Sequence, residues 1–117
     1  MEIKVNIPSQ DIIDYLVTAL EGGSNYWYHL PDSTMLRSYN DPLALSERIA
    51  MSALDGEEIP VHDNENPEEL IGHICKHNIE QGIKLFIENG NKFDPGMDAD
   101  EADVLFQYIV MGEVVYG

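Results

Sequence analysis

Apolar residues recur at helical spacing in four segments of this chain, and a glycine follows each segment. The segments lie within residues 12–20, 43–53, 70–87 and 102–110, and the glycines are Gly22, Gly56, Gly90 and Gly112. Side chains three and four positions apart share one face of a helix, and glycine readily takes the left-handed backbone that commonly ends a helix. The sequence therefore predicts four helices, each with one buried face.

Capping residues predict where these helices begin. Ser9 is the expected N-cap of the first helix. Asp41-Pro42 and Asn66-Pro67 each combine an N-cap with a proline at the first helical position. Asp98 and Glu101 have the spacing of a capping box and start the last helix.

The third helix is expected to run without interruption over residues 67–88. Gly72 and Gly82 lie inside it, where each glycine costs about 0.5–1 kcal/mol relative to alanine. We expect these two glycines to allow close packing against another backbone.

Four further segments have strand character. Residues 2–7 alternate apolar and polar side chains, and residues 25–30 and 34–39 are expected to form short strands. Residues 57–63 should lie at a sheet edge because Pro60 has no amide hydrogen to give a central ladder. The pattern predicts an α+β fold in a single domain over residues 1–117, with a small mostly antiparallel sheet packed against three to four helices. The segment 113–117 could return to that sheet as one more short strand.

The charge balance limits the partners of such a domain. The 117 residues include 22 Asp and Glu against 6 Lys and Arg, a formal charge of −16. This surface repels nucleic acid and anionic membranes and favours basic partners or cations. Because Cys75 is the single cysteine, no intramolecular disulfide can form, which suits a reducing cytoplasm. With no apolar run of about 20 residues and no signal-peptide pattern, we expect a cytoplasmic protein without membrane or direct nucleic-acid contacts.

Three consecutive aromatic residues, Tyr26, Trp27 and Tyr28, follow the first helix. In one interpretation Trp27 packs in the core while the two tyrosines frame it with their hydroxyl groups toward water. In the other, the segment is a contact surface, because tyrosine and tryptophan are enriched in binding hot spots. Tyr39, Tyr108 and Tyr116 could join this surface if segment 113–117 folds back toward the first helix.

Two stretches carry a family resemblance: ALEGGSNYW near the start and ADVLFQYIVMGEVVYG at the end. The chain resembles a family of small phage and prophage proteins in which a helix runs into Gly-Gly-x-Asn-Tyr-Trp. The family pattern closes on Gln-Tyr and Gly-Glu-hydrophobic-Val-Tyr-Gly. The matching positions are Gly22, Gly23, Asn25, Tyr26, Trp27, Gln107, Tyr108, Gly112, Glu113, Val115, Tyr116 and Gly117. The resemblance spans the whole chain and implies a phage or prophage origin; it carries over no activity and no catalytic residue.

Metal binding through histidine has one candidate. His73 and His77 are four positions apart on the predicted third helix, so they share a face, and His62 or Asp63 could supply a third ligand. Cys75 is expected in the middle of that helix among apolar neighbours, where a free cysteine is usually inert. Two solvent-facing histidines are the favoured interpretation.

Calcium binding has a second candidate, the acidic stretch with Asp94, Asp98, Asp100, Glu101 and Asp103. The stretch does not follow the spacing of an EF-hand loop. Helix capping and the helix dipole account for much of it. We therefore predict no metal site, no cofactor and no catalytic residue.

The favoured hypothesis is a non-enzymatic binding protein of phage type that acts on a basic host or phage protein. In one specific form, its carboxylates mimic nucleic-acid phosphates and give it an anti-defence or host-takeover role. The predicted contact residues are aromatic and acidic: Tyr26, Trp27, Tyr28, Tyr108, Tyr116, Glu57, Glu58, Asp98, Asp100 and Glu101. Further carboxylates expected to be exposed are Asp63, Glu65, Glu68 and Asp103.

Two alternatives come from other classes of protein. One is a small-ligand-binding or sequestering protein with an aromatic pocket lined by Tyr26, Trp27 and Tyr108. The other is a structural or assembly protein that forms homo-oligomers, with Gly72 and Gly82 at a subunit contact.

Overall fold

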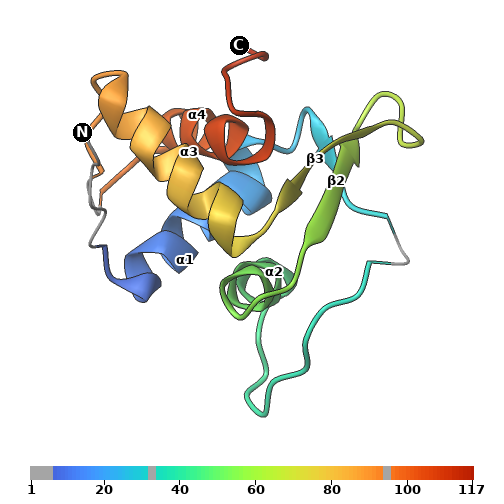
Figure 1. Cartoon of the computed structure of the whole chain (residues 1–117). Helices are drawn as coiled ribbons and strands as arrows, with labels where there is room; N and C mark the ends of the chain where they lie inside the picture. The colour runs from blue at the N-terminus through green and yellow to red at the C-terminus, as the bar shows by residue number, and fades with distance from the viewer. Residues whose placement is uncertain (1–6, 32–33, 94–95) are drawn as a thin grey trace.

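Four α-helices and a three-stranded antiparallel sheet make up the described part of the chain, so the predicted α+β fold is confirmed (Figure 1). The computed structural model describes residues 7–31, 34–93 and 96–117. The elements, in order, are α1 (Ser9–Thr18), the π-helical turn η1 (Ala19–Gly23), β1 (Tyr28–His29), α2 (Leu45–Leu54), β2 (Ile59–Asp63), β3 (Leu70–Ile74), α3 (Lys76–Glu88) and α4 (Ala99–Met111).

The sheet has the strand order β1-β2-β3, and both neighbouring pairs are antiparallel. The prediction that residues 57–63 form an edge strand is wrong, because β2 lies in the centre. Strand β1 is only two residues long and pairs with His62 and Asp63 alone. Pro60 pairs with His73 of β3 and has no β1 partner opposite it. Its missing amide hydrogen is therefore tolerated, because the sheet is locally two-stranded at that point.

The predicted third helix over residues 67–88 is wrong in its first third. Residues 64–69 form the loop of a β2–β3 hairpin, in which the amide of Glu69 donates to the carbonyl of Asn66 at 2.9 Å. Residues 70–74 then pair with β2, and α3 begins only at Lys76. Pairing with a distant strand satisfies the backbone groups of residues 70–74 and overrides their local helix signals. Cys75 is consequently the N-cap of α3 in an extended conformation, not a residue in the middle of a helix.

Two other predicted helix starts are also wrong. Pro8, not Ser9, occupies the N-cap position of α1. Helix α2 begins at Leu45, and Asp41-Pro42 lies in the irregular segment before it. There the backbone amide of Ala44 donates to the Glu47 carboxylate at 3.4 Å, so a local side chain replaces the expected cap.

The start and end of α4 follow the prediction. The Asp98 side chain accepts a hydrogen bond from the amide of Glu101 at 2.9 Å. Gly112 ends the helix with a φ of 76°, in the left-handed region that glycine adopts without strain.

Some predicted strands have no counterpart. Residues 34–39 and 113–117 form no strand, although both belong to the described structure. The predicted strand over residues 2–7 lies outside the described residues, apart from Ile7, which is in no regular element.

Helix α4 packs against α1, η1, β3 and α3, with α3 alongside it (Figure 1). Its buried face supplies Ala102, Leu105, Phe106 and Ile109 to the core. The radius of gyration of 13.3 Å is close to the value of about 13 Å expected for a compact body of this length. Within residues 7–31, 34–93 and 96–117, no helix combines the length and the apolar character needed to cross a membrane.

Three glycines let other backbones approach α4. A Cβ atom at Gly82 would lie 2.7 Å from the Cα of Ile109, and one at Gly72 would collide with the carbonyl of Val110. A Cβ atom at Gly23 would collide in the same way with the carbonyl of Ala99. The predicted close packing of Gly72 and Gly82 is confirmed. The contacts lie within one chain, so these glycines do not supply the subunit contact that the assembly hypothesis gave them.

Candidate functional site

Asp103, on the inner face of α4, is a buried carboxylate that accepts three side-chain hydrogen bonds. Its Oδ1 accepts from Ser24 Oγ and from Trp27 Nε1, both at 2.7 Å. Its Oδ2 accepts from the hydroxyl of Tyr26 at 2.5 Å. Hydrogen bonds to a charged acceptor are stronger than neutral ones, so a single side chain fixes the whole segment 24–27 onto α4.

The prediction that Asp103 is exposed is wrong, since only 8% of the residue is accessible. The charge of the residue suggested a surface position, whereas its spacing suggests the core. Asp103, Phe106, Gln107 and Val110 lie at positions i, i+3, i+4 and i+7 of one helix face, and all four are buried. That spacing was the available sequence signal for a buried carboxylate.

Trp27 is 1% exposed and packs in the core, as the first of the two interpretations held, but that interpretation is wrong about the tyrosine hydroxyl groups, which donate to protein acceptors and not to water. Its indole lies 5.3 Å from the ring of Phe106 and 5.4 Å from the ring of Tyr116, measured between centroids. Tyr28 is half-buried, and its hydroxyl donates to the carbonyl of Leu20 at 2.5 Å. Trp27 therefore anchors the segment and is not available as a contact residue.

Gln107 folds segment 113–117 back over this anchor without forming a strand. Its Oε1 accepts from the amides of Val115 and Tyr116 at 2.8 Å each, and its Nε2 donates to the carbonyl of Tyr116 at 3.0 Å. As a result, the ring of Tyr116 lies edge-to-face with that of Tyr26, with centroids 6.4 Å apart and an interplanar angle of 89°.

Tyr26 stays 49% exposed although its hydroxyl is anchored. Partial burial, the hydrogen bond to Asp103, and the charges of Asp103 and Asp100 raise the pKa of Tyr26 from 10.0 to about 12. Asp100 is exposed one turn before Asp103 on α4. The half-exposed Tyr26 and the exposed carboxylate of Asp100 therefore lie near each other at the start of α4.

The β2–β3 hairpin supplies carboxylates near Tyr116, the second ring of the tyrosine pair. Burial and the charges of Asp63, Glu69 and Glu65 raise the pKa of Tyr116. The hairpin is tied to the aromatic segment, because the amide of Asn64 donates to the carbonyl of Trp27 at 2.8 Å. We call the resulting set the acidic tyrosine surface: Tyr26, Tyr116, Asp63, Glu65, Glu69 and Asp100.

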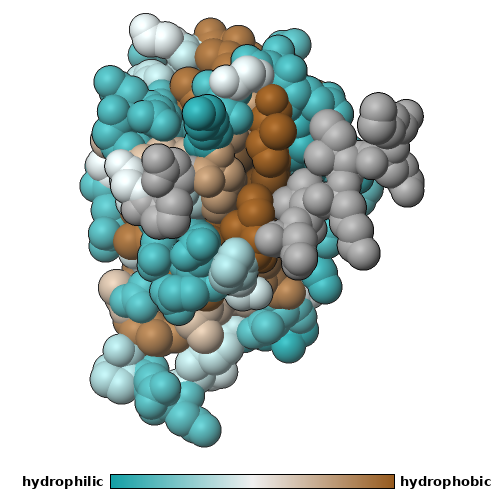
Figure 2. Space-filling model, turned by 90° about the vertical axis from the view of Figure 1, so that its left-hand side faces the viewer, coloured by the Kyte–Doolittle hydropathy of each residue, from teal (hydrophilic) through white to brown (hydrophobic). Residues whose placement is uncertain are grey.

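Most carboxylates of the described residues are not neutralised by a neighbouring cation. Across residues 7–31, 34–93 and 96–117 there is one ion pair, between Arg37 and Glu57 at 3.0 Å. On the face shown in Figure 2, hydrophilic residues cover much of the surface, and apolar residues form a vertical strip near the centre and smaller patches at the top and the lower left. Among the residues that the structure describes, exposed carboxylates such as those of Glu65, Glu69 and Asp100 therefore carry unpaired negative charge at the surface.

The other predicted contact residues are dispersed. Glu57 and Glu58 lie immediately before β2, whereas the hairpin carboxylates lie at or after its end. Asp98 serves as the N-cap of α4, with Glu101 exposed beside it. Tyr108 lines a groove of about 250 Å³ between α3 and α4, together with Leu85, Met111 and others. The predicted pocket of Tyr26, Trp27 and Tyr108 is not formed, because Trp27 is enclosed and Tyr108 faces this separate groove.

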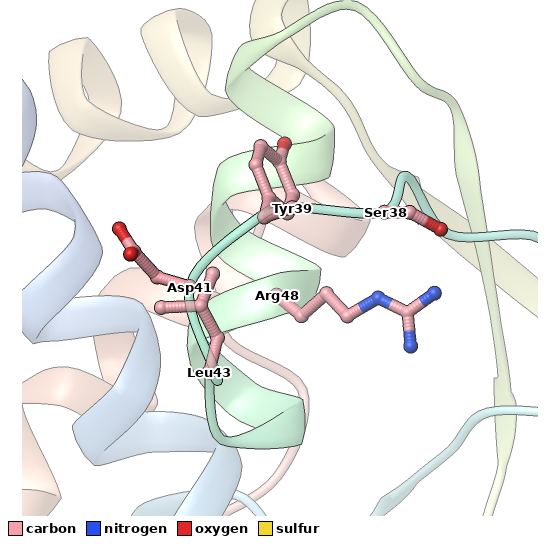
Figure 3. Close-up of a pocket in the computed structure, with 5 residues that line it drawn as sticks. All are labelled: Ser38, Tyr39, Asp41, Leu43 and Arg48. Atoms are coloured by element: carbon pink, nitrogen blue, oxygen red, sulfur yellow. The ribbon is translucent and has the colours of Figure 1, made fainter.

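A second cavity of about 250 Å³ lies in the segment before α2 and is lined by Ser38, Tyr39, Asp41, Leu43 and Arg48 (Figure 3). The guanidinium of Arg48 points away from Tyr39 and Asp41, and its Nε donates to the carbonyl of Arg37 at 2.7 Å. Tyr39 donates to Asp55 at 2.6 Å and does not join the aromatic segment. The charged groups of this cavity do not converge on a common point.

The histidine pair predicted from the sequence is split between two elements, with His73 on β3 and His77 on α3. The structure instead pairs His29 with His62 across β1 and β2, and His62 Nδ1 lies 2.8 Å from the carbonyl of Pro67. No group of three or more His, Cys, Asp or Glu side chains in the described residues has the geometry to hold a metal ion. Asp94 of the predicted calcium stretch lies outside those residues.

No protein-family model matches this chain, and no curated protein or solved structure is significantly similar to it. A function therefore has to be proposed from the geometry of the acidic tyrosine surface.

Proposed function

We propose that this chain is a non-enzymatic binding protein of phage type, and that its acidic tyrosine surface contacts a basic host or phage protein. One observation carries the proposal: the half-exposed Tyr26 lies against Tyr116, with carboxylates of the hairpin and of α4 acting on the two tyrosines. Tyrosine contributes a large contact area at a low cost in side-chain entropy. The surrounding charge steers basic partners toward it.

The surface is also fixed before any partner arrives. Asp103 holds Tyr26, Gln107 holds Tyr116, and Asn64 ties the hairpin to Trp27. Groups that are already ordered lose little conformational entropy on binding, so more of the contact energy remains for affinity.

The hydroxyl group of Ser24, which shares the Asp103 carboxylate with Tyr26, is inaccessible to a substrate. Ser24 is 0% exposed and donates its hydroxyl hydrogen to Asp103. A role in binding therefore fits the surface better than a role in catalysis.

Nucleic-acid mimicry is the specific form of the proposal that the charge supports. A formal charge of −16 with one ion pair among the described residues leaves carboxylates free to occupy a site built for phosphates. The partner would then be a host or phage protein that binds nucleic acid through lysine and arginine, in keeping with the resemblance to phage and prophage proteins.

The test starts with an affinity-tagged chain that retrieves partners from a bacterial lysate at low salt. A purified basic partner is then titrated calorimetrically at salt concentrations from about 50 mM to about 500 mM, with and without competing DNA. We expect the affinity to fall steeply with salt and the DNA to compete.

Two variants locate the contact. Tyr26→Ala combined with Glu65→Gln and Glu69→Gln should weaken binding at least about tenfold, because it removes a hot-spot ring and two charges. Glu80→Gln with Glu88→Gln removes the same charge from exposed positions of α3 and should change the affinity less than about twofold. Equal losses in the two variants, or binding that is insensitive to salt, would argue against the proposal.

A further inference from the structure

We infer that the acidic tyrosine surface selects an arginine side chain of its partner over a lysine, with the guanidinium lying on the exposed ring of Tyr26. This inference rests on the proposed function and names the group that the surface recognises.

The part of the Tyr26 and Tyr116 pair that remains accessible favours a planar cation as its ligand. Trp27 stacks on Tyr116 with an interplanar angle of 13°, so one face of Tyr116 is already occupied. Tyr26 meets Tyr116 edge-to-face and keeps 49% of its surface exposed. A guanidinium is planar and weakly hydrated and stacks on such a ring, whereas an ammonium is a compact and strongly hydrated charge.

The carboxylate acceptors near the tyrosine pair also favour arginine over lysine. In the described part of the chain, no ion pair occupies the carboxylates of Glu65, Glu69 or Asp100. The charge of Asp100 acts on Tyr26 and the charges of the two glutamates act on Tyr116, so each tyrosine of the pair has carboxylate acceptors in its neighbourhood. A guanidinium carries five N–H donors in one plane and can donate to more than one carboxylate while it stacks, whereas a lysine ammonium does not stack in this way.

The ring is held still for this contact. Asp103 Oδ2 accepts from the Tyr26 hydroxyl at 2.5 Å, and Asn64 Nδ2 donates to the Tyr26 carbonyl at 3.5 Å. Because the ring has a fixed orientation, stacking costs little additional side-chain entropy, and a planar group gains more from it than a spherical one.

The experiment uses two fluorescently labelled peptides of equal length and charge, nona-arginine and nona-lysine, titrated with the full chain at about 50 mM and about 150 mM salt. We expect salt-sensitive binding of both peptides, with nona-arginine about five- to tenfold tighter. Tyr26→Phe should keep most of the preference, because the ring remains although its hydrogen bond to Asp103 is lost, and Tyr26→Leu should abolish the preference. Both variants lose the hydrogen bond to Asp103, so they differ in the aromatic ring alone. Tyr39→Leu, outside the surface, is the control and should keep the preference.

A second measurement needs no variant. The side-chain proton signals of an arginine peptide should move upfield on binding, because a stacked guanidinium lies in the ring current of Tyr26. Equal affinities of the two peptides, a preference that survives in Tyr26→Leu, or unshifted arginine signals would each overturn the inference while leaving the proposed function standing. Absence of salt-sensitive binding by either peptide would count against the proposed function itself.

Discussion

The ring of Tyr116 stacks on the indole of Trp27 with centroids 5.4 Å apart and planes 13° apart. This contact joins the segment after α4 to the segment after α1. It also joins the core to the proposed contact surface, because Trp27 is buried and Tyr116 flanks the exposed Tyr26. Substitutions that loosen the core at this point should therefore also loosen the surface.

Replacing Asp103 should destabilise the fold. Asp103→Ala leaves the buried donors of Ser24 and Trp27 without an acceptor, at a cost of about 3 kcal/mol. We expect the melting temperature, measured by circular dichroism, to fall by about 10 °C. Asp100→Asn, at an exposed position one turn earlier, should stay within about 0.5 kcal/mol of the wild type. Similar effects of the two substitutions would contradict the anchoring role of Asp103.

Replacing Gln107 should release segment 113–117. Gln107→Leu has a similar volume and removes all three hydrogen bonds to Val115 and Tyr116. We expect amide exchange at these two residues to become at least about tenfold faster, since opening then costs at least about 1.4 kcal/mol less. Trp27 fluorescence should shift to longer wavelength as Tyr116 leaves the indole. Unchanged exchange in a folded variant would show that other contacts hold the segment.

The two adjacent glycines after α1 should respond in opposite ways to alanine. Gly22 has no positive φ, and a Cβ atom at this position would meet no other atom within 4 Å. Gly22→Ala should therefore leave stability unchanged or raise it by up to about 1 kcal/mol. Gly23→Ala forces a methyl group into the carbonyl of Ala99 and should cost about 1–3 kcal/mol. Urea unfolding of the two variants tests this difference, and a neutral Gly23→Ala would disprove the close approach of α4.

Alkaline pH should destabilise the chain through Tyr26. The pKa of Tyr26 is about 12 in the folded state, against an ordinary tyrosine value of 10.0. The folded state therefore holds this proton more tightly than the unfolded state. The stabilisation is complete below about pH 10 and is lost as the pH rises toward about 12. A tyrosinate absorbance titration of the wild type should show a late step near pH 12 that Tyr26→Phe lacks; a variant that keeps the step would assign it to another tyrosine.

Local patterns were sufficient for the parts of the fold that local chemistry decides. The apolar stripes within residues 12–20 and 102–110 became α1 with η1 and α4. Asp98 caps the start of α4, and Gly112 ends the helix in the left-handed conformation, as expected. Caps of this kind depend on atoms within a few residues of the helix end, so the local sequence is sufficient to predict where such a helix begins and ends.

The errors arose where a distant partner decides the conformation. Residues 66–69 carry cap and helix-start residues, yet they form a hairpin loop because residues 70–74 pair with β2. Pro60 was expected at an edge, and only the shortness of β1 explains its position in a central strand. Neither the pairing nor the length of the neighbouring strand can be read from the local sequence.

The candidate site was predicted in part. The sequence singled out Tyr26 and the possible return of Tyr116, but it did not separate the buried Trp27 from the exposed Tyr26. It assigned Asp103 to the surface because aspartate is rarely buried without partners. Those partners are the side chains of residues 24–27, which lie far earlier in the chain.

The three donors to Asp103 precede it in the chain by 79, 77 and 76 positions. On a translating ribosome they emerge long before their acceptor, and Trp27 has neither Asp103 nor Tyr116 to enclose it until α4 and the following segment have left the exit tunnel. Once Trp27 has emerged, the nascent chain therefore carries its only indole without these two partners, and the core around it closes only after segment 113–117 has also left the tunnel.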